Sequence, residues 1–118
     1  MASGARDSVI YHNPRCTTSR KTLELLRDNG LEPTVVEYLK TPPSRDALLG
    51  MIRDAGIDVR SAVRKRESLY TELNLADATD DQLLDAMLEH PILIERPFVV
   101  TPKGTRLARP VDTVREIL

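Results

Sequence analysis

Cys16 is the only cysteine of this 118-residue chain, and its neighbours are those of a reactive thiol. It follows the turn Asn13-Pro14 and precedes a helical pattern. The free N–H groups of a helix start and flanking arginines both favour thiolate over thiol. A lone cysteine can also be a small buried hydrophobic residue, but Cys16 lies among polar residues. We therefore expect a nucleophilic thiolate whose disulfide partner comes from another molecule.

Several polar residues close to Cys16 could support this chemistry. His12 ends a short apolar strand, and as an imidazolium it would favour the thiolate; an ordinary surface histidine is the alternative. Ser19 completes a Cys-x-x-Ser spacing, so its hydroxyl could hydrogen-bond the sulfur. The amide of Asn13 could bind an anion, and Arg20 adds positive charge at the helix start.

Three arginines further along the chain suggest an oxyanion site. Arg96 and Arg109 each precede a proline, and Arg64 lies in a short basic run. A tetrahedral oxyanion requires permanently charged groups with several donors, which guanidinium supplies. Because most of the 17 basic residues are arginines, each of the three taken alone could equally be a surface residue.

Composition excludes several classes of protein. A net charge of -1 argues against a general nucleic-acid binder. No apolar run approaches the roughly 20 residues of a membrane-spanning helix, and no Cys/His spacing indicates a metal site. The single cysteine fits a reducing cytoplasm. We expect one domain over residues 1–118, with residues 1–7 as a flexible tail rather than a signal peptide.

The apolar periodicity predicts an alternation of strands and helices. It predicts a βαβ unit first, then a helical block whose middle we cannot delimit, then a hairpin and a last helix. Ser44 and the Thr79-to-Gln82 spacing mark two helix starts, and Pro110 is suited to the first turn of the last helix. The predicted elements are strands over 8–12 and 34–39, helices over 19–29, 44–56 and 79–90, short helices within 57–75, a hairpin over 97–108, and a helix over 110–118.

This order defines an α/β fold. A βαβ half and a ββα half make a thioredoxin-like fold, here with a helical insertion between the halves. A flavodoxin-like fold would need more βα units than the chain contains. A low-molecular-weight phosphatase loop is disfavoured, because Lys21 occupies the position five residues after Cys16 where that loop requires arginine.

Several motifs together resemble the glutaredoxin-coupled arsenate reductase family, ArsC. They occur in order over nearly the whole chain, from about residue 9 to residue 118. The matching segments are Tyr11-His12-Asn13-Pro14-x-Cys16-x-x-Ser19-Arg20, Glu32-Pro33-Thr34, Tyr38-Leu39-x-Thr41-Pro42-Pro43, His90-Pro91-Ile92-Leu93-Ile94-x-Arg96-Pro97 and Thr101-Pro102-x-Gly104-Thr105-Arg106-Leu107-x-Arg109-Pro110.

The resemblance implies a function and roles for residues. Cys16 would attack arsenate, His12 would lower its pKa, and Arg64, Arg96 and Arg109 would hold the oxyanion. Ser19 and Arg20 would lie near the thiolate, and Arg96-Pro97 would be a cis peptide bond beside it. No bound cofactor is implied. Glutathione would be the co-substrate, glutaredoxin would resolve the mixed adduct, and arsenite would leave; we expect a monomer.

Two other functions stay open at this point. A thiol oxidoreductase of the same family could act on a protein mixed disulfide, although such a substrate needs no arginine clamp. A non-enzymatic regulator resembling the Spx proteins would share the fold. Those regulators usually carry Cys-x-x-Cys, whereas this chain has Ser19 at the second position.

Overall fold

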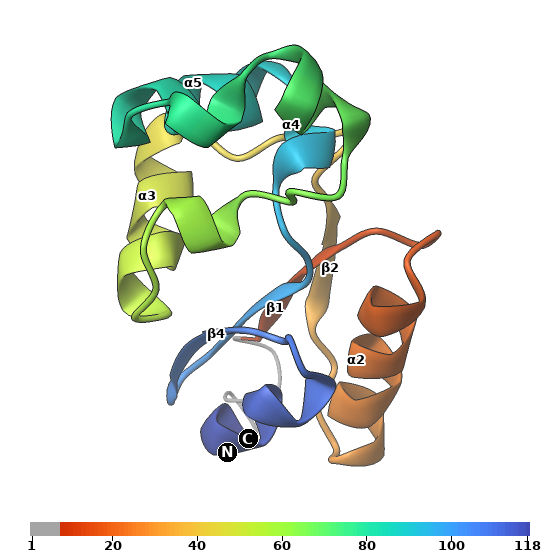
Figure 1. Cartoon of the computed structure of the whole chain (residues 1–118). Coiled ribbons are helices and arrows are strands. Elements are labelled where there is room, and N and C mark those ends of the chain that lie inside the picture. Colours follow the sequence, from red (N-terminus) through yellow and green to blue (C-terminus); the bar gives the residue numbers. More distant parts are fainter. Residues whose placement is uncertain (1–7) are drawn as a thin grey trace. The chain divides into compact units, whose positions relative to one another are not determined.

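The computed structural model describes residues 8–118, so the expected tail over residues 1–7 lies outside the described residues. The chain divides into two compact units. The first contains the chain up to Thr41 and from Arg96 to Leu118, and the second contains Pro42 to Glu95 (Figure 1). The helical insertion predicted between the two halves is thus confirmed, whereas the single domain stays a prediction.

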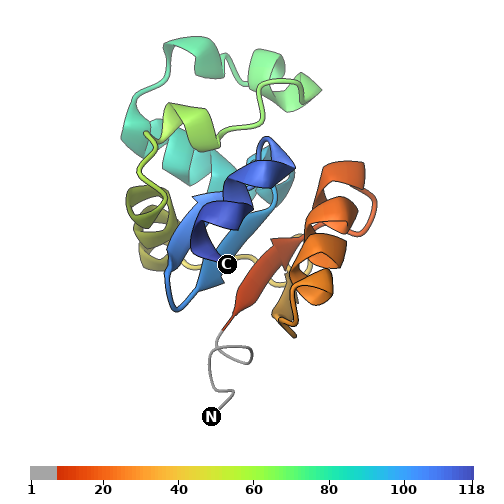
Figure 2. The same ribbon diagram turned by 90° about the horizontal axis from the view of Figure 1, so that it is seen from below.

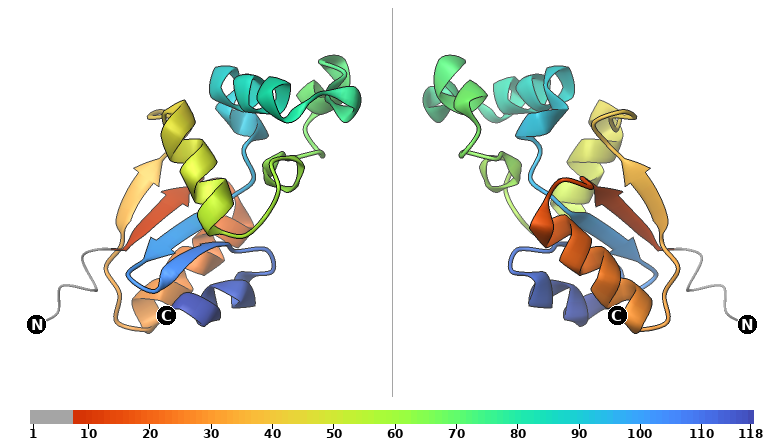
Figure 3. Two further views of the ribbon diagram at one scale, coloured as in Figure 1. Left: turned by 90° about the vertical axis from the view of Figure 1, so that its left-hand side faces the viewer. Right: turned by 90° about the vertical axis from the view of Figure 1, so that its right-hand side faces the viewer.

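The first unit is built on a four-stranded sheet in the order β2-β1-β3-β4. Strand β1 (Val9–His12) pairs in parallel with β2 (Thr34–Glu37), as the βαβ prediction requires. β3 (Phe98–Thr101) is antiparallel to β1 and forms a hairpin with β4 (Gly104–Leu107). The arrowheads in Figure 3 show β1 and β2 running together and β3 running against them.

One face of this sheet is covered by two helices. α2 (Thr17–Asp28) connects β1 to β2, and a 3-10 helix, η4 (Val111–Ile117), ends the chain; Figure 2 shows both in front of the strands. Each buried Val, Leu or Ile side chain here contributes roughly 1.5–3 kcal/mol by leaving water. The shared core consists of Ile10, Leu26, Val99, Ala108, Val114 and Ile117.

Alternation along β1 determines which residue reaches the helix face. Ile10 and His12 are buried on the same side, since side chains two apart share a face. On α2 the buried positions Ser19, Thr22 and Leu26 form one stripe. The last residue of β1 and the first turn of α2 therefore face each other, and this is where the candidate site begins.

The second unit is helical. α3 (Arg45–Asp54) begins at its N-cap Ser44, whose side chain accepts the N–H of Ala47. α5 (Asp80–Glu89) begins with a complete capping box between Thr79 and Gln82. Both predicted helix starts are confirmed. Arg45 of α3 forms ion pairs with Asp81 and Asp85 of α5.

The segment that resisted prediction contains short helices held by one arginine. They are η1 (Arg60–Ala62), α4 (Ser68–Glu72) and η2 (Leu75–Asp77), and η3 (Pro91–Leu93) follows α5. The Arg60 guanidinium donates to the carbonyl oxygens of Leu75 and Ala78 at 3.1 and 2.6 Å. Hydrogen bonds between a side chain and the backbone of a distant residue leave no periodic pattern in the sequence. The boundaries of these short helices therefore could not be predicted.

The last helix differs from the prediction. It starts at Val111, after Pro110, and is a 3-10 helix rather than an α-helix. Val114 and Ile117 are both fully buried, and their spacing of three matches a 3-10 turn. Within residues 8–118, no helix is long and apolar enough to cross a bilayer.

Candidate active site

Cys16 is the N-cap residue of α2, directly after the turn that follows β1. Its N–H donates to the Asn13 carbonyl at 3.0 Å, and its carbonyl accepts the Arg20 N–H at 3.0 Å. The side chain makes no cap hydrogen bond of standard geometry and is partly exposed. The predicted position at a strand-to-helix turn is confirmed.

Two of the three predicted arginines converge on this sulfur. The Nη2 atom of Arg109 lies 3.7 Å from Cys16 Sγ. Its Nε donates to the backbone carbonyl of Arg96 at 2.8 Å, and Arg96 itself is only 5% exposed. The Arg96-Pro97 bond is cis, as the resemblance implied, and Arg109-Pro110 is a second cis bond that was not predicted.

The pKa of Cys16 is lowered by this environment. Burial by itself would raise the pKa, but the Ser19 backbone N–H and the hydrogen bonding and charge of Arg96 outweigh it. The charge of Arg109 acts in the same direction. The thiolate is therefore favoured by the helix start and by two guanidinium groups, as a nucleophilic cysteine requires.

The role of His12 toward the thiolate stays a prediction. Burial lowers the pKa of His12, which disfavours the imidazolium that this role requires. Its Nδ1 is 2.6 Å from Ser19 Oγ, and the same oxygen accepts the Asn13 N–H at 3.1 Å. The Ser19 hydroxyl thus interacts with His12 and Asn13 rather than with the sulfur. The backbone N–H of Ser19 makes the hydrogen bond to Cys16 that was expected of the side chain.

Asn13 and Arg20 shape the loop around the cysteine. The Asn13 carboxamide oxygen accepts the Arg15 N–H at 3.0 Å, which closes a tight turn. Arg20 donates to the Pro14 carbonyl at 2.9 Å and to Thr17 Oγ1 at 3.3 Å. Both side chains therefore brace the turn that presents the sulfur.

Arg64, the third predicted anion ligand, belongs to the second unit. There its guanidinium forms ion pairs with Glu67 at 3.2 Å and Glu95 at 3.6 Å. The backbone N–H of Arg64 donates to the Leu93 carbonyl at 2.7 Å. Arg64 is thus held by two carboxylates of its own unit, and its role toward an oxyanion stays a prediction.

Tyr38 is a neighbour of the candidate site that the sequence analysis did not single out as a site residue. It directly follows β2 and is 1% exposed. Asn13, Arg96 and Cys16 all influence its pKa, which burial raises above its ordinary value. The one available signal was topological, since the carboxyl ends of two parallel strands meet at one edge of a sheet.

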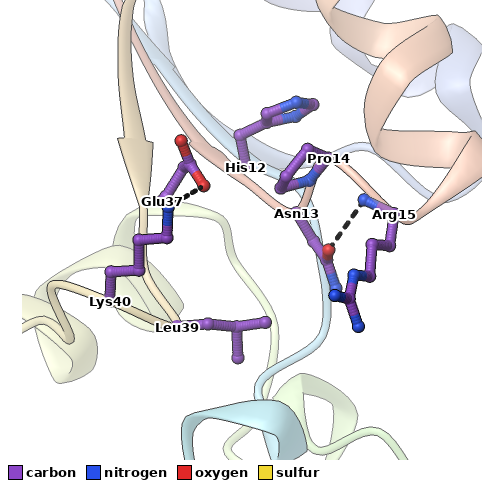
Figure 4. A pocket seen from close by; sticks show the side chains of 7 residues that line it. All are labelled: His12, Asn13, Pro14, Arg15, Glu37, Leu39 and Lys40. Carbon is purple, nitrogen blue, oxygen red and sulfur yellow. Dashed lines mark hydrogen bonds and ion pairs between the residues drawn. The ribbon is translucent and has the colours of Figure 1, made fainter.

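A hollow of about 340 Å³ opens beside the loop that precedes Cys16. Figure 4 shows Arg15 on one side, Glu37 and Lys40 on the other, and Leu39 pointing between them. Glu37 and Lys40 lie 3.5 Å apart in an exposed ion pair. The hollow thus offers charges of both signs beside the loop that leads to Cys16.

The fold and site together define a thioredoxin-like protein with one activated cysteine. The cysteine follows the first strand of the sheet through a short turn, and a cis-proline follows one of the arginines beside it. Within residues 8–118, no three His, Cys, Asp or Glu side chains are grouped as metal ligands would be.

Comparison with known proteins identifies the family. The sequence model of the ArsC family matches residues 11–117, and the chain belongs to this family. It is 61% identical to an arsenate reductase of Escherichia coli and 60% identical to one of Rhizobium meliloti (strain 1021). These alignments cover 93% of the chain and 79% and 80% of the relatives.

A solved structure confirms the fold. The arsenate reductase from Vibrio cholerae superposes with a TM-score of 0.90 at 49% identity. The match covers 94% of this chain and 97% of the other. The predicted thioredoxin-like architecture with its helical insertion is therefore confirmed.

Proposed function

We propose that this protein reduces arsenate to arsenite, with Cys16 as the nucleophile and glutathione and glutaredoxin as the source of electrons. The observation that carries the proposal is the Arg109 guanidinium 3.7 Å from Cys16 Sγ. A donor with several N–H groups beside a thiolate suits a reaction in which an oxyanion must approach another anion. The high identity to several arsenate reductases supports the same substrate.

The first step is nucleophilic. The Cys16 thiolate attacks arsenic, a sulfur–arsenic bond forms, and one oxygen leaves as water after taking up protons. Arg96 and Arg109 neutralise the charge of the incoming anion and of the departing oxygen. We assign Arg64 to the same oxyanion on the strength of the family resemblance.

The second step transfers electrons. A glutathione thiolate attacks the Cys16 sulfur of the adduct and forms a sulfur–sulfur bond. The sulfur–arsenic bond breaks, and its electron pair stays on arsenic, which becomes trivalent. The two sulfurs end as a disulfide, and glutaredoxin returns the protein to its thiol form. In total, one arsenate and two thiols give one arsenite, one disulfide and one water.

The charges of the hollow support glutathione as the thiol. Glutathione carries two carboxylates and one ammonium, and the hollow offers two cations, Arg15 and Lys40, and one anion, Glu37. Its volume of about 340 Å³ falls in the range typical of small-molecule sites. We further propose that the protein works as a monomer without a bound cofactor, and in the cytoplasm, where its thiol stays reduced.

The test is arsenite formation by the purified protein with arsenate, glutathione and glutaredoxin. We expect turnover that requires all three additions and is abolished in Cys16→Ser. Turnover retained in Cys16→Ser would contradict the mechanism. Fast alkylation of Cys16 without any turnover would instead favour a protein disulfide as the substrate.

A further inference from the structure

The hydroxyl of Tyr38 is an unusual feature of the first unit. The side chain is 1% exposed, and among residues 8–118 its oxygen has no hydrogen-bond partner of standard geometry. A buried tyrosine hydroxyl normally finds a partner, because leaving it unpaired costs free energy. A phenylalanine would fill the same space without that cost, so packing alone does not explain the tyrosine.

The surroundings of the hydroxyl belong to the candidate active site. β1 pairs with β2 so that His12 lies opposite Glu37, and Asn13 and Tyr38 follow these two residues at the same edge of the sheet. The polar side chains of Asn13 and Arg96 act on the phenol by hydrogen bonding, and the charge of Cys16 reaches it as well. Burial keeps the phenol protonated at neutral pH. The hydroxyl is therefore a neutral, buried group among residues of the candidate active site.

The candidate active site contains many hydrogen-bond donors but few acceptors for the proton of the Tyr38 hydroxyl. Around Cys16, the Ser19 N–H and the Arg96 and Arg109 guanidinium groups all donate. The carboxamide oxygen of Asn13 already accepts the Arg15 N–H. An anion bound beside Cys16 would bring acceptor oxygens to this group of donors.

We propose that Tyr38 is a catalytic residue whose O–H donates a hydrogen bond to an oxygen of arsenate bound at Cys16. The inference rests on the proposed function. The arginines supply charge, and the phenol supplies one fixed, uncharged donor that positions the oxyanion for attack. No proton is transferred in this step, because the Tyr38 hydroxyl keeps its proton throughout.

The decisive variant is Tyr38→Phe, with Tyr70→Phe as the matched control. Tyr70 also loses one hydroxyl, but this hydroxyl accepts a hydrogen bond from Arg60 at 3.2 Å in the second unit. We expect Tyr38→Phe to lower kcat/KM for arsenate about 10- to 100-fold, as loss of one donor to a charged group does. Its Tm should be unchanged or higher. Tyr70→Phe should lower Tm and leave kcat/KM within twofold.

Two further readouts separate this proposal from a structural role and from the proposed function. The pH profile of Cys16 alkylation by iodoacetamide should be the same in Tyr38→Phe and wild type. Arsenate should protect Cys16 from alkylation, and Tyr38→Phe should need about tenfold more arsenate for equal protection. This second readout requires no turnover, so it tests Tyr38 even if arsenate is bound but not reduced.

Several outcomes would overturn the proposal. A Tyr38→Phe protein with wild-type kcat/KM and wild-type protection would show that the hydroxyl does not touch arsenate. A lower Tm would assign the hydroxyl a structural role, and a shifted alkylation profile would make the thiolate its partner. Absence of arsenate protection in the wild-type protein would remove the bound anion and the proposal with it.

Discussion

Arg109 connects the backbone of Arg96 to the sulfur of Cys16. Its Nε donates to the Arg96 carbonyl at 2.8 Å while its Nη2 lies 3.7 Å from Sγ. The two nitrogens of one planar group thus have separate tasks, one fixing the side chain and one facing the nucleophile. Only a guanidinium has this forked geometry.

Arg109→Lys tests this double attachment. Lysine keeps the positive charge but cannot donate to the Arg96 carbonyl and face the sulfur through one rigid plane. We expect the pKa of Cys16 to rise and kcat/KM for arsenate to fall about 10- to 100-fold. The measurements are the pH profile of iodoacetamide alkylation and steady-state kinetics.

The control for this variant is Arg115→Lys. Arg115 pairs with Asp112 on the exposed surface of η4, and exposed pairs contribute little. It should match wild type in both assays. Equal behaviour of Arg109→Lys and wild type would refute the anchoring role of the guanidinium.

Ser19→Ala should destabilise the fold rather than disable the thiolate. The substitution leaves the buried Asn13 N–H and one nitrogen of His12 without their shared partner, which costs about 1–3 kcal/mol per unpaired group. The Ser19 backbone N–H, which lowers the pKa of Cys16, stays in place. Urea denaturation should show the loss, with little change in the alkylation profile.

Thr17→Ala serves as the comparison for Ser19→Ala. Thr17 also loses a hydroxyl in the first turn of α2, but its oxygen only accepts an exposed Arg20 donor at 3.3 Å. It should cost less than about 0.5 kcal/mol. A loss of thiolate reactivity in Ser19→Ala at full stability would mean that the hydroxyl acts on the sulfur after all.

His12 should make the protein less stable as the pH falls below neutrality. Burial lowers the pKa of His12, opposed by Glu37 and reinforced by Arg27 and Arg20. The unfolded chain therefore takes up a proton near pH 6.5 that the folded protein resists, so stability decreases as pH falls through that range. In His12→Asn the decrease between pH 7 and pH 5 should be shallower.

The second histidine provides the control for this pH dependence. His90→Asn leaves His12 in place, so its denaturation midpoints should follow the wild-type slope between pH 7 and pH 5. Identical slopes in wild type and His12→Asn would show that His12 is not the group that titrates.

Lys40→Gln tests the hollow as the entry site for glutathione. Loss of one exposed charge should raise KM for glutathione about two- to fivefold, consistent with about 1 kcal/mol at most. Arsenate kinetics at saturating glutathione should be unchanged. Lys21→Gln removes an equally charged side chain of α2 outside the hollow. This variant should leave both KM for glutathione and the kinetics with arsenate unaltered.

If Lys40→Gln changed neither constant, glutathione would have to approach Cys16 from elsewhere. A small neutral thiol offers an internal comparison. Its rate should be insensitive to Lys40→Gln, because it carries no carboxylate for the lysine to attract.

Local sequence determined the features that depend on near neighbours. Cys16 at a strand-to-helix turn, the Ser44 cap and the Thr79 capping box were all predictable, because each depends on residues within one helical turn. The alternation of strand and helix patterns likewise predicted a thioredoxin-like fold. The cis bond at Pro97 was expected only from the family resemblance.

Tertiary structure decided what acts on the sulfur. Arg109 lies 93 positions from Cys16 in the chain, and no periodicity encodes such a contact. The burial that lowers the pKa of His12 and isolates the Tyr38 hydroxyl exists only once the sheet and α2 have formed. The pKa of a side chain and the partners of a hydroxyl depend on three-dimensional surroundings. Residue type and spacing therefore predicted Cys16 as the nucleophile but not the groups that surround it.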